Sequence, residues 1–275
     1  MKRSKIFLSS GIFPWFTLSK ITNFAKENSF DGIELLPTRQ IIKNFENDYQ
    51  TNPLVFKSIK GIHHNWRLDI GQDKKYGINM LNSLVFMLIR LTFFPSVSKS
   101  RTFLQYLSKT IDCPVTIHNI SSKWTKDNNK KGFKGGVSCE IMDITITPQA
   151  LKEWLTHANH FIVVDTRDDQ SSLWAKKYGF KDWKQFWMWI GLQKIKSIQL
   201  TLIGTSTIKK ILDHKKTLAE EQLIWMNKNK WEGNVTVEVN PISILLSNKF
   251  KLKEGLSEIS FFTRQTLIHG KKWSY

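Results

Sequence analysis

The stretch Val235-Thr236-Val237-Glu238-Val239-Asn240-Pro241 decides the fold of this chain. Its apolar and polar residues alternate with a period of two, which predicts a β-strand whose valines share one face. Pro241 ends the strand because proline cannot donate a hydrogen bond to a sheet. Glu238 lies on the polar face, and a carboxylate in a buried strand is costly unless a cation meets it. The strand therefore indicates a polar site to which other strands should also contribute.

Further strand patterns precede this one, and helical patterns separate most of them. The expected strands cover residues 5–9, 30–37, 60–64, 114–118, 137–142, 161–165, 197–202 and 235–241. The expected helices cover about 17–28, 38–47, 81–93, 99–110, 147–158, 171–190, 207–227, 241–248 and 254–268, with Thr17 or Ser19 and Thr147 as N-caps. This alternation predicts an α/β fold, a (β/α)8 TIM barrel that residues 1–275 form as a single domain. Residues 121–136 show no apolar period, so we expect the helix between strands four and five to be incomplete or missing.

The composition limits the partners and the compartment. The chain has 41 basic and 23 acidic residues, a formal net charge of +18 and a pI near 9.8. Such a surplus attracts anions, including nucleic acid and phosphorylated sugars, unless it only reflects a compositional bias toward lysine. The two cysteines have no CxxC spacing, which fits a reducing cytoplasm. We expect no signal peptide and no membrane segment, because no cleavage site follows the basic N-terminus and the apolar run 81–94 is too short to cross a bilayer. The oligomeric state stays open.

Polar side chains stand near the C-terminal ends of several expected strands, where TIM barrels carry their chemistry. The inward-facing candidates are Glu34, His63 or His64, His118, Glu140, Asp165, Gln199, Thr201 and Glu238. Buried carboxylates on neighbouring strands would repel one another unless a metal joined them. Carboxylates mixed with imidazoles suit Mn, Mg or Zn, and this set does not decide among the three metals.

The order of these motifs resembles the xylose-isomerase-like TIM-barrel superfamily, which holds sugar isomerases, sugar-phosphate epimerases and apurinic endonucleases. The resemblance covers nearly the whole chain and is carried by Gly32-Ile33-Glu34-Leu35, His63, His118, Ser138-Cys139-Glu140, Val163-Val164-Asp165-Thr166 and Thr236-Val237-Glu238-Val239. It implies metal ligands at Glu140 on strand five, Asp165 on strand six and Glu238 on strand eight. Asp168, which stands where the family often has a histidine after strand six, is a further candidate ligand.

The chain departs from this pattern on strand seven. The family places a metal-binding histidine there, whereas Gln199 and Thr201 occupy the corresponding positions of this sequence. The resemblance therefore leaves open whether the metal site is complete.

The resemblance implies a divalent-metal-dependent sugar or sugar-phosphate isomerase or epimerase that transfers a proton next to a carbonyl. A divalent cation would polarise the substrate oxygens, and Glu140 and Glu238 would take and return the proton. The small anionic or sugar substrate would be bound by Glu34, His63, His118, Arg67, Arg167 and Lys123, whose basic members could hold a phosphate.

Two alternatives remain open. An apurinic endonuclease-like phosphodiesterase is favoured by the basic composition and by His63 and His118, because those enzymes draw imidazole ligands from strands three and four. The missing strand-seven histidine argues against it. Such an enzyme also needs further histidine ligands, whereas the histidines at 157, 160, 214 and 269 lie on apparent helices. The other alternative is a barrel that has lost catalysis and binds a partner or nucleic acid through its charge.

Overall fold

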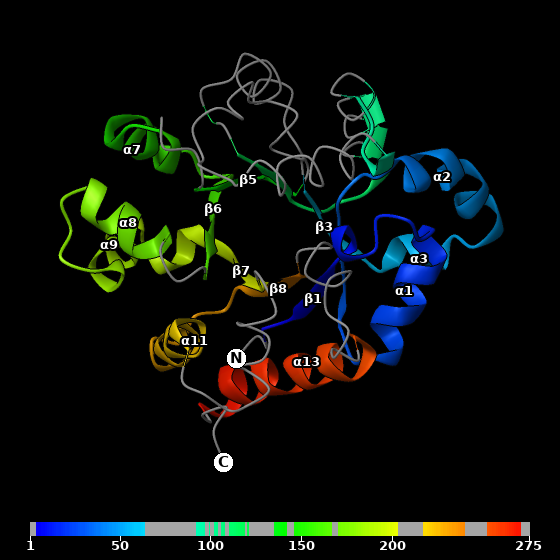
Figure 1. Cartoon of the computed structure of the whole chain (residues 1–275). Coiled ribbons are helices and arrows are strands. Elements are labelled where there is room, and N and C mark those ends of the chain that lie inside the picture. Colours follow the sequence, from blue (N-terminus) through cyan, green and yellow to red (C-terminus); the bar gives the residue numbers. More distant parts are fainter. Residues whose placement is uncertain are drawn as a thin grey trace.

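Eight parallel strands form a closed barrel in which each strand pairs with the next in chain order and β8 pairs with β1 (Figure 1). The strands are β1 Ile6–Ser9, β2 Gly32–Leu35, β3 Ile59–His63, β4 Val115–Ile117, β5 Val137–Glu140, β6 His160–Asp165, β7 Ile195–Leu202 and β8 Asn234–Val239. This computed structural model describes residues 4–63, 92–96, 99, 102–103, 106–107, 110–118, 120, 135–141, 146–166, 170–202, 217–239 and 252–270. The predicted (β/α)8 barrel is confirmed.

The last strand, β8, has the alternation that its sequence predicts. Val235, Val237 and Val239 are fully buried in the apolar core. Thr236 pairs in register with Gln199 of β7, and Glu238 pairs with Thr201. Gln199 contacts His63 of β3, which lies across the barrel, so its side chain points into the lumen. Because β-strand side chains alternate between faces, Thr236 and Glu238 point into the lumen as well.

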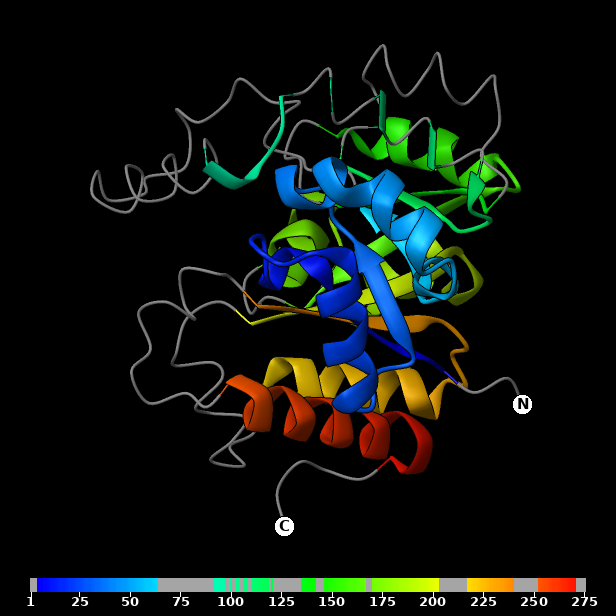
Figure 2. The same cartoon turned by 90° about the vertical axis from the view of Figure 1, so that its right-hand side faces the viewer.

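Helices surround the barrel on its outer side (Figures 1 and 2). The described helices are α1 Leu18–Glu27, α2 Arg39–Thr51, α3 Leu54–Lys57, α7 Pro148–Thr156, α8 Gln170–Lys177, α9 Trp183–Ile190, α11 Leu218–Lys228 and α13 Leu252–His269, with short 3-10 turns η1 Ser10–Ile12 and η3 Leu192–Lys194. Thr17, not Ser19, caps α1 by accepting from the amide of Lys20, and Thr147 caps α7 as expected. Helices α11 and α13 lie side by side below the barrel in Figure 2.

The aromatic-rich segment 171–190 differs from the single helical region expected. It forms two helices, α8 and α9, because Gly179 adopts a φ of +78° that interrupts the first and Asp182 caps the second. Residue 160, expected on a helix, begins β6 instead. The sequence pattern also did not predict α3, which is a single turn of Leu54–Lys57.

Several predictions fall on residues that the structure does not describe. These are residues 81–91 of the helix at 81–93, half of the helix at 99–110, the helix at 241–248, the first part of the helix at 207–227 and residues 121–134 between β4 and β5. The expected gap in the helical ring between β4 and β5 is compatible with the structure. In the described parts of the chain, no helix is both long and apolar enough to cross a membrane.

An ion pair joins the C-terminal helix to the base of the barrel. Arg264 of α13 donates to Asp31 Oδ2 at 3.0 Å and to the carbonyl oxygen of Ser29 at 2.9 Å. Asp31 Oδ2 also accepts from the backbone amide of Ile6 in β1 at 2.9 Å. One carboxylate thus holds α13 against the strands where the barrel closes.

Candidate metal centre

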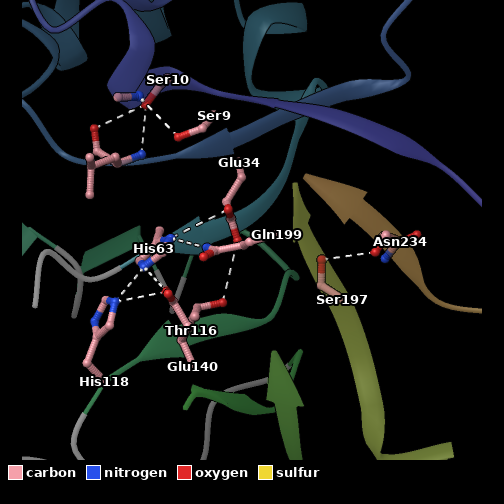
Figure 3. Close-up of polar contacts among 12 residues, drawn as sticks. Ser9, Ser10, Glu34, His63, Thr116, His118, Glu140, Ser197, Gln199 and Asn234 are labelled. Carbon is pink, nitrogen blue, oxygen red and sulfur yellow. Dashed lines mark hydrogen bonds and ion pairs between the residues drawn. The ribbon is translucent and has the colours of Figure 1, made fainter. Parts of the chain in front are cut away.

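Six polar side chains from five strands and their ends meet inside the barrel near the C-terminal ends of the strands (Figure 3). They are Glu34 of β2, His63 of β3, Thr116 of β4, His118 just after β4, Glu140 of β5 and Gln199 of β7. All six are buried, with exposed fractions between 0% and 5%. The alternation of strand side chains brings them to one face, and the closure of the barrel brings β7 opposite β3.

The centre of this group is a triangle of two imidazoles and a carboxylate. His63 Nε2 lies 3.1 Å from His118 Nε2, and Glu140 Oε2 lies 3.2 Å from His63 Nε2 and 2.9 Å from His118 Nε2. The two rings stack with their centroids 4.8 Å apart. Three potential ligand atoms therefore converge on one point from three consecutive strands.

Gln199 and Glu34 hold this triangle from the other side. The amide nitrogen of Gln199 donates to both carboxylate oxygens of Glu140, at 3.0 and 2.9 Å, while its oxygen accepts from His63 Nδ1 at 2.9 Å. The reverse orientation would point an amide oxygen at two carboxylate oxygens, so it is excluded. Glu34 Oε2 lies 3.5 Å from the same His63 Nδ1.

The hydrogen bonds within the triangle favour a protonated imidazole beside an ionised carboxylate. Burial disfavours the charged form of His63, but hydrogen bonds to Glu140 and Glu34 outweigh burial and hold its pKa well above 6.5. Burial also disfavours ionisation of Glu140, yet His118 and His63 outweigh it and hold the pKa of this carboxyl well below 4.5. The folded protein thus keeps a carboxylate beside an imidazolium in its lumen.

A divalent cation fits the place that this proton occupies. Nδ1–H of His63 donates to Gln199, so the other proton of this imidazolium is carried on His63 Nε2, between the two rings and Glu140. A metal ion would replace that proton. Tetrahedral zinc with bonds of about 2.1 Å places its ligand atoms about 3.4 Å apart. The observed separations of 2.9 to 3.2 Å approach that value. Among the described residues, these three side chains are the group whose ligand atoms could hold a metal ion.

Two further carboxyl groups face the same lumen. Asp165 ends β6 and is buried, whereas Glu238 of β8 is half-buried. Burial raises the pKa of Glu238 to about 7. The charge of His63 works against this rise, and nearby carboxylates, Glu140 and Asp165 among them, add to it. The carboxyl group of Glu238 therefore interacts electrostatically with the triangle. In the metal-free protein it is partly protonated and partly ionised near pH 7.

The structure brings together some of the residues expected from the sequence. Glu34, His63, His118 and Glu140 meet, with the two histidines in the position of metal ligands as well as of substrate contacts. The other expected residues, Arg67, Lys123, Arg167 and Asp168, lie outside the described residues. The roles of Asp165 and Glu238 as ligands stay predictions.

The contacts of Gln199 do not follow from the sequence pattern. The sequence indicates that Gln199 faces inward and that Gln199 and Thr201 stand in the place of an expected histidine, but it does not predict that Gln199 contacts two potential ligands. Its phase on β7 was the available signal, because an inward amide opposite His63 must find hydrogen-bond partners when buried.

Comparison with known proteins identifies the fold. No protein-family model matches the sequence, and no curated protein matches it. A xylose isomerase domain-containing protein from Salmonella typhimurium LT2 has a similar structure, with 12% identity, a TM-score of 0.56, and coverage of 96% of this chain and 97% of that one. A 3-keto-D-glucoside 4-epimerase from E. coli gives 12% identity, a TM-score of 0.54, and coverage of 96% and 100%. A D-psicose 3-epimerase from Clostridium cellulolyticum H10, solved with D-tagatose, gives 10% identity, a TM-score of 0.53, and coverage of 96% and 99%.

These likenesses show that the chain has the fold of the xylose-isomerase-like TIM barrels that its motifs resemble. At identities of 10–12%, they show the fold alone.

Proposed function

We propose that the protein is a divalent-metal-dependent enzyme that isomerises or epimerises a sugar or sugar derivative by proton transfer next to a carbonyl. The observation that carries this proposal is the buried His63–His118–Glu140 triangle at the catalytic end of the barrel, with the half-buried carboxyl of Glu238 in the same lumen. A metal-ligand set beside a second carboxyl group suits enolisation-type chemistry, because the cation can polarise a carbonyl while the carboxyl group moves a proton.

The ligand set favours zinc. Two imidazole nitrogens and one carboxylate oxygen form a set that zinc uses at catalytic sites, with a fourth position left for water or substrate. Magnesium prefers oxygen ligands, and manganese shares that preference. A cation held by His63, His118 and Glu140 would supply Lewis-acid polarisation of substrate oxygens.

Glu238 would carry the proton. Burial raises its pKa to about 7 in the metal-free protein, so of the two carboxyl groups Glu238 is the one better suited to take and return a proton. Glu140 is a poor candidate for this step because its pKa is held low by two imidazoles, so we assign it the role of ligand. Glu34 and Asp165 would accept hydrogen bonds from substrate hydroxyls.

The comparisons support the substrate class. The E. coli protein is named as an epimerase of a keto-glucoside and the Clostridium protein as an epimerase of a ketose. Both names describe configuration changes in polyhydroxylated carbonyl compounds, the chemistry that Glu238 and a Lewis acid would perform together.

Hydrogen exchange tests this proposal across a range of candidate sugars. The zinc-loaded protein is incubated with a panel of ketoses, aldoses and their phosphates in D2O, and proton NMR follows the positions next to the carbonyl. We expect deuterium at one such position, at a rate that Glu238→Gln lowers at least ~100-fold. Glu232→Gln serves as the matched control, because Glu232 is exposed just before β8. No exchange with any sugar would refute the proposal.

The same assay includes a DNA duplex with an abasic site. Cleavage at that site without sugar exchange would replace the isomerase assignment by an apurinic endonuclease activity. Binding that ignores the abasic site and disappears at high salt would indicate electrostatic binding by a barrel without this catalysis.

A further inference from the structure

We infer that Gln199 is a positioning residue that fixes the proton on His63 and the orientation of Glu140, so that the triangle binds one divalent cation per chain. This inference rests on the metal site of the proposed function. It assigns a specific task to one of the two residues, Gln199 and Thr201, that stand where the resemblance leads one to expect a metal-binding histidine.

The first contact of Gln199 sets the tautomer of His63. The amide oxygen accepts from His63 Nδ1 at 2.9 Å, and an oxygen acceptor requires that this nitrogen carry a hydrogen. The unprotonated lone pair of a neutral His63 is then on Nε2, which faces His118 Nε2 at 3.1 Å. This is the tautomer that a metal ligand needs, and it is fixed by the hydrogen bond at the other ring nitrogen.

The second contact orients the carboxylate. The Gln199 amide nitrogen lies 3.0 Å from Glu140 Oε1 and 2.9 Å from Oε2, so it restrains the rotation of the carboxylate plane. Oε2 still has a lone pair for the imidazoles, at 2.9 Å from His118 Nε2. Because Gln199 is fully buried, these hydrogen bonds do not compete with water.

The geometry also favours one cation over two. A histidine at position 199 would add an imidazole near Glu140, whereas the glutamine amide is already engaged with His63 and Glu140. In the part of the chain that the structure describes, His63, His118 and Glu140 are the group at metal-binding separation. The cation therefore belongs to the β3–β5 side of the lumen.

Zinc binding to the full-length protein tests this inference. Wild type and Gln199→Met are stripped with a chelator, and zinc affinity is measured by competition with a chromophoric chelator. Methionine keeps the approximate length of glutamine but makes neither hydrogen bond. We expect wild type to bind one zinc ion per chain, and Gln199→Met to bind it about 10–100-fold more weakly, the usual effect of losing such an outer partner. The d–d absorption of the cobalt-substituted variant should also change, which a purely structural role would not require.

Ser197→Ala is the matched control. Ser197 lies on the same strand and donates to the carbonyl oxygen of Asn234 at 3.1 Å, so its loss should leave zinc affinity and the cobalt spectrum unchanged. Equal zinc affinity and an unchanged cobalt spectrum in Gln199→Met would overturn the inference, as would two zinc ions per chain in wild type.

A second measurement uses wild type alone, in case Gln199→Met does not fold. Long-range 1H–15N correlation spectra of the zinc-loaded protein should show His63 protonated on Nδ1 and metal-bound through Nε2. A proton on Nε2 would refute the inference. If zinc binding depends on Gln199 but no sugar exchanges hydrogen, the proposed function fails and this inference stands. If a sugar exchanges hydrogen but zinc affinity does not depend on Gln199, the proposed function stands and this inference fails.

Discussion

Replacing Glu238 by glutamine should stabilise the metal-free protein, although Glu238 is a central site residue. Burial and nearby carboxylates raise its pKa from 4.5 to about 7, with His63 opposing the rise. Between these pH values the folded protein holds a proton that the unfolded chain has lost, so stability falls as the pH rises through this window. A glutamine at this position carries no such penalty, because its amide does not ionise.

The size of the effect follows from the shift. A rise of about 2.5 pKa units corresponds to about 3 kcal/mol once the pH exceeds 7, since each unit is worth about 1.4 kcal/mol. At pH 4.5 the difference between Glu238→Gln and wild type should be less than about 0.5 kcal/mol, because the carboxyl of the unfolded chain is then only half ionised. The advantage of the variant should therefore appear between pH 4.5 and 7 and then stay level.

Urea unfolding of chelator-treated protein, followed by circular dichroism at pH 4.5, 5.5, 7 and 8.5, measures this difference. Glu232→Gln, at an exposed position, should give the same difference from wild type at every pH. A Glu238→Gln variant that is less stable than wild type at pH 8.5, or a difference that does not change with pH, would refute the reasoning about this carboxyl group.

Three further perturbations follow from the contacts described above. His118→Ala removes a nitrogen 2.9 Å from Glu140 Oε2 and should weaken zinc binding at least ~100-fold in chelator competition; an unchanged affinity would place the cation elsewhere. Asp31→Ala removes the acceptor shared by Ile6 and Arg264 and should lower the free energy of unfolding by about 1–3 kcal/mol, seen as a lower urea midpoint. Gly179→Ala should lower the free energy of unfolding by about 1–2 kcal/mol, because the φ of +78° is unfavourable for alanine although no atom lies within 4 Å of the added methyl group. An unchanged urea midpoint would show that this backbone conformation does not require glycine.

The barrel could be predicted from the sequence because its strands carry strong local signals. In β8 the alternation of valine with polar residues defines both the strand and its inward face, and the same phase rule identified Glu34 on β2 and Glu140 on β5. The break between α8 and α9 was harder to foresee, because Trp183 and its neighbours continue an apolar helical pattern across Gly179.

The residues of the site could be predicted from the sequence, but which of them contact one another could not. Strand phase tells which side chains enter the lumen, whereas the distance between His63 and His118 depends on barrel closure and on side-chain rotation. The motifs therefore group Glu140 with Asp165 and Glu238, whereas in the structure two imidazole nitrogens lie 2.9 and 3.2 Å from its carboxylate. The contact of Gln199 with His63 spans the barrel between residues 136 positions apart, which no local pattern reports.

The most direct test of the metal centre is anomalous diffraction at the zinc edge from crystals of the zinc-loaded protein. We expect one peak per chain, bonded at about 2.0–2.2 Å to His63 Nε2, His118 Nε2 and Glu140 Oε2. No peak, or a peak bonded to Asp165 and Glu238 without either histidine, would contradict this account of the site.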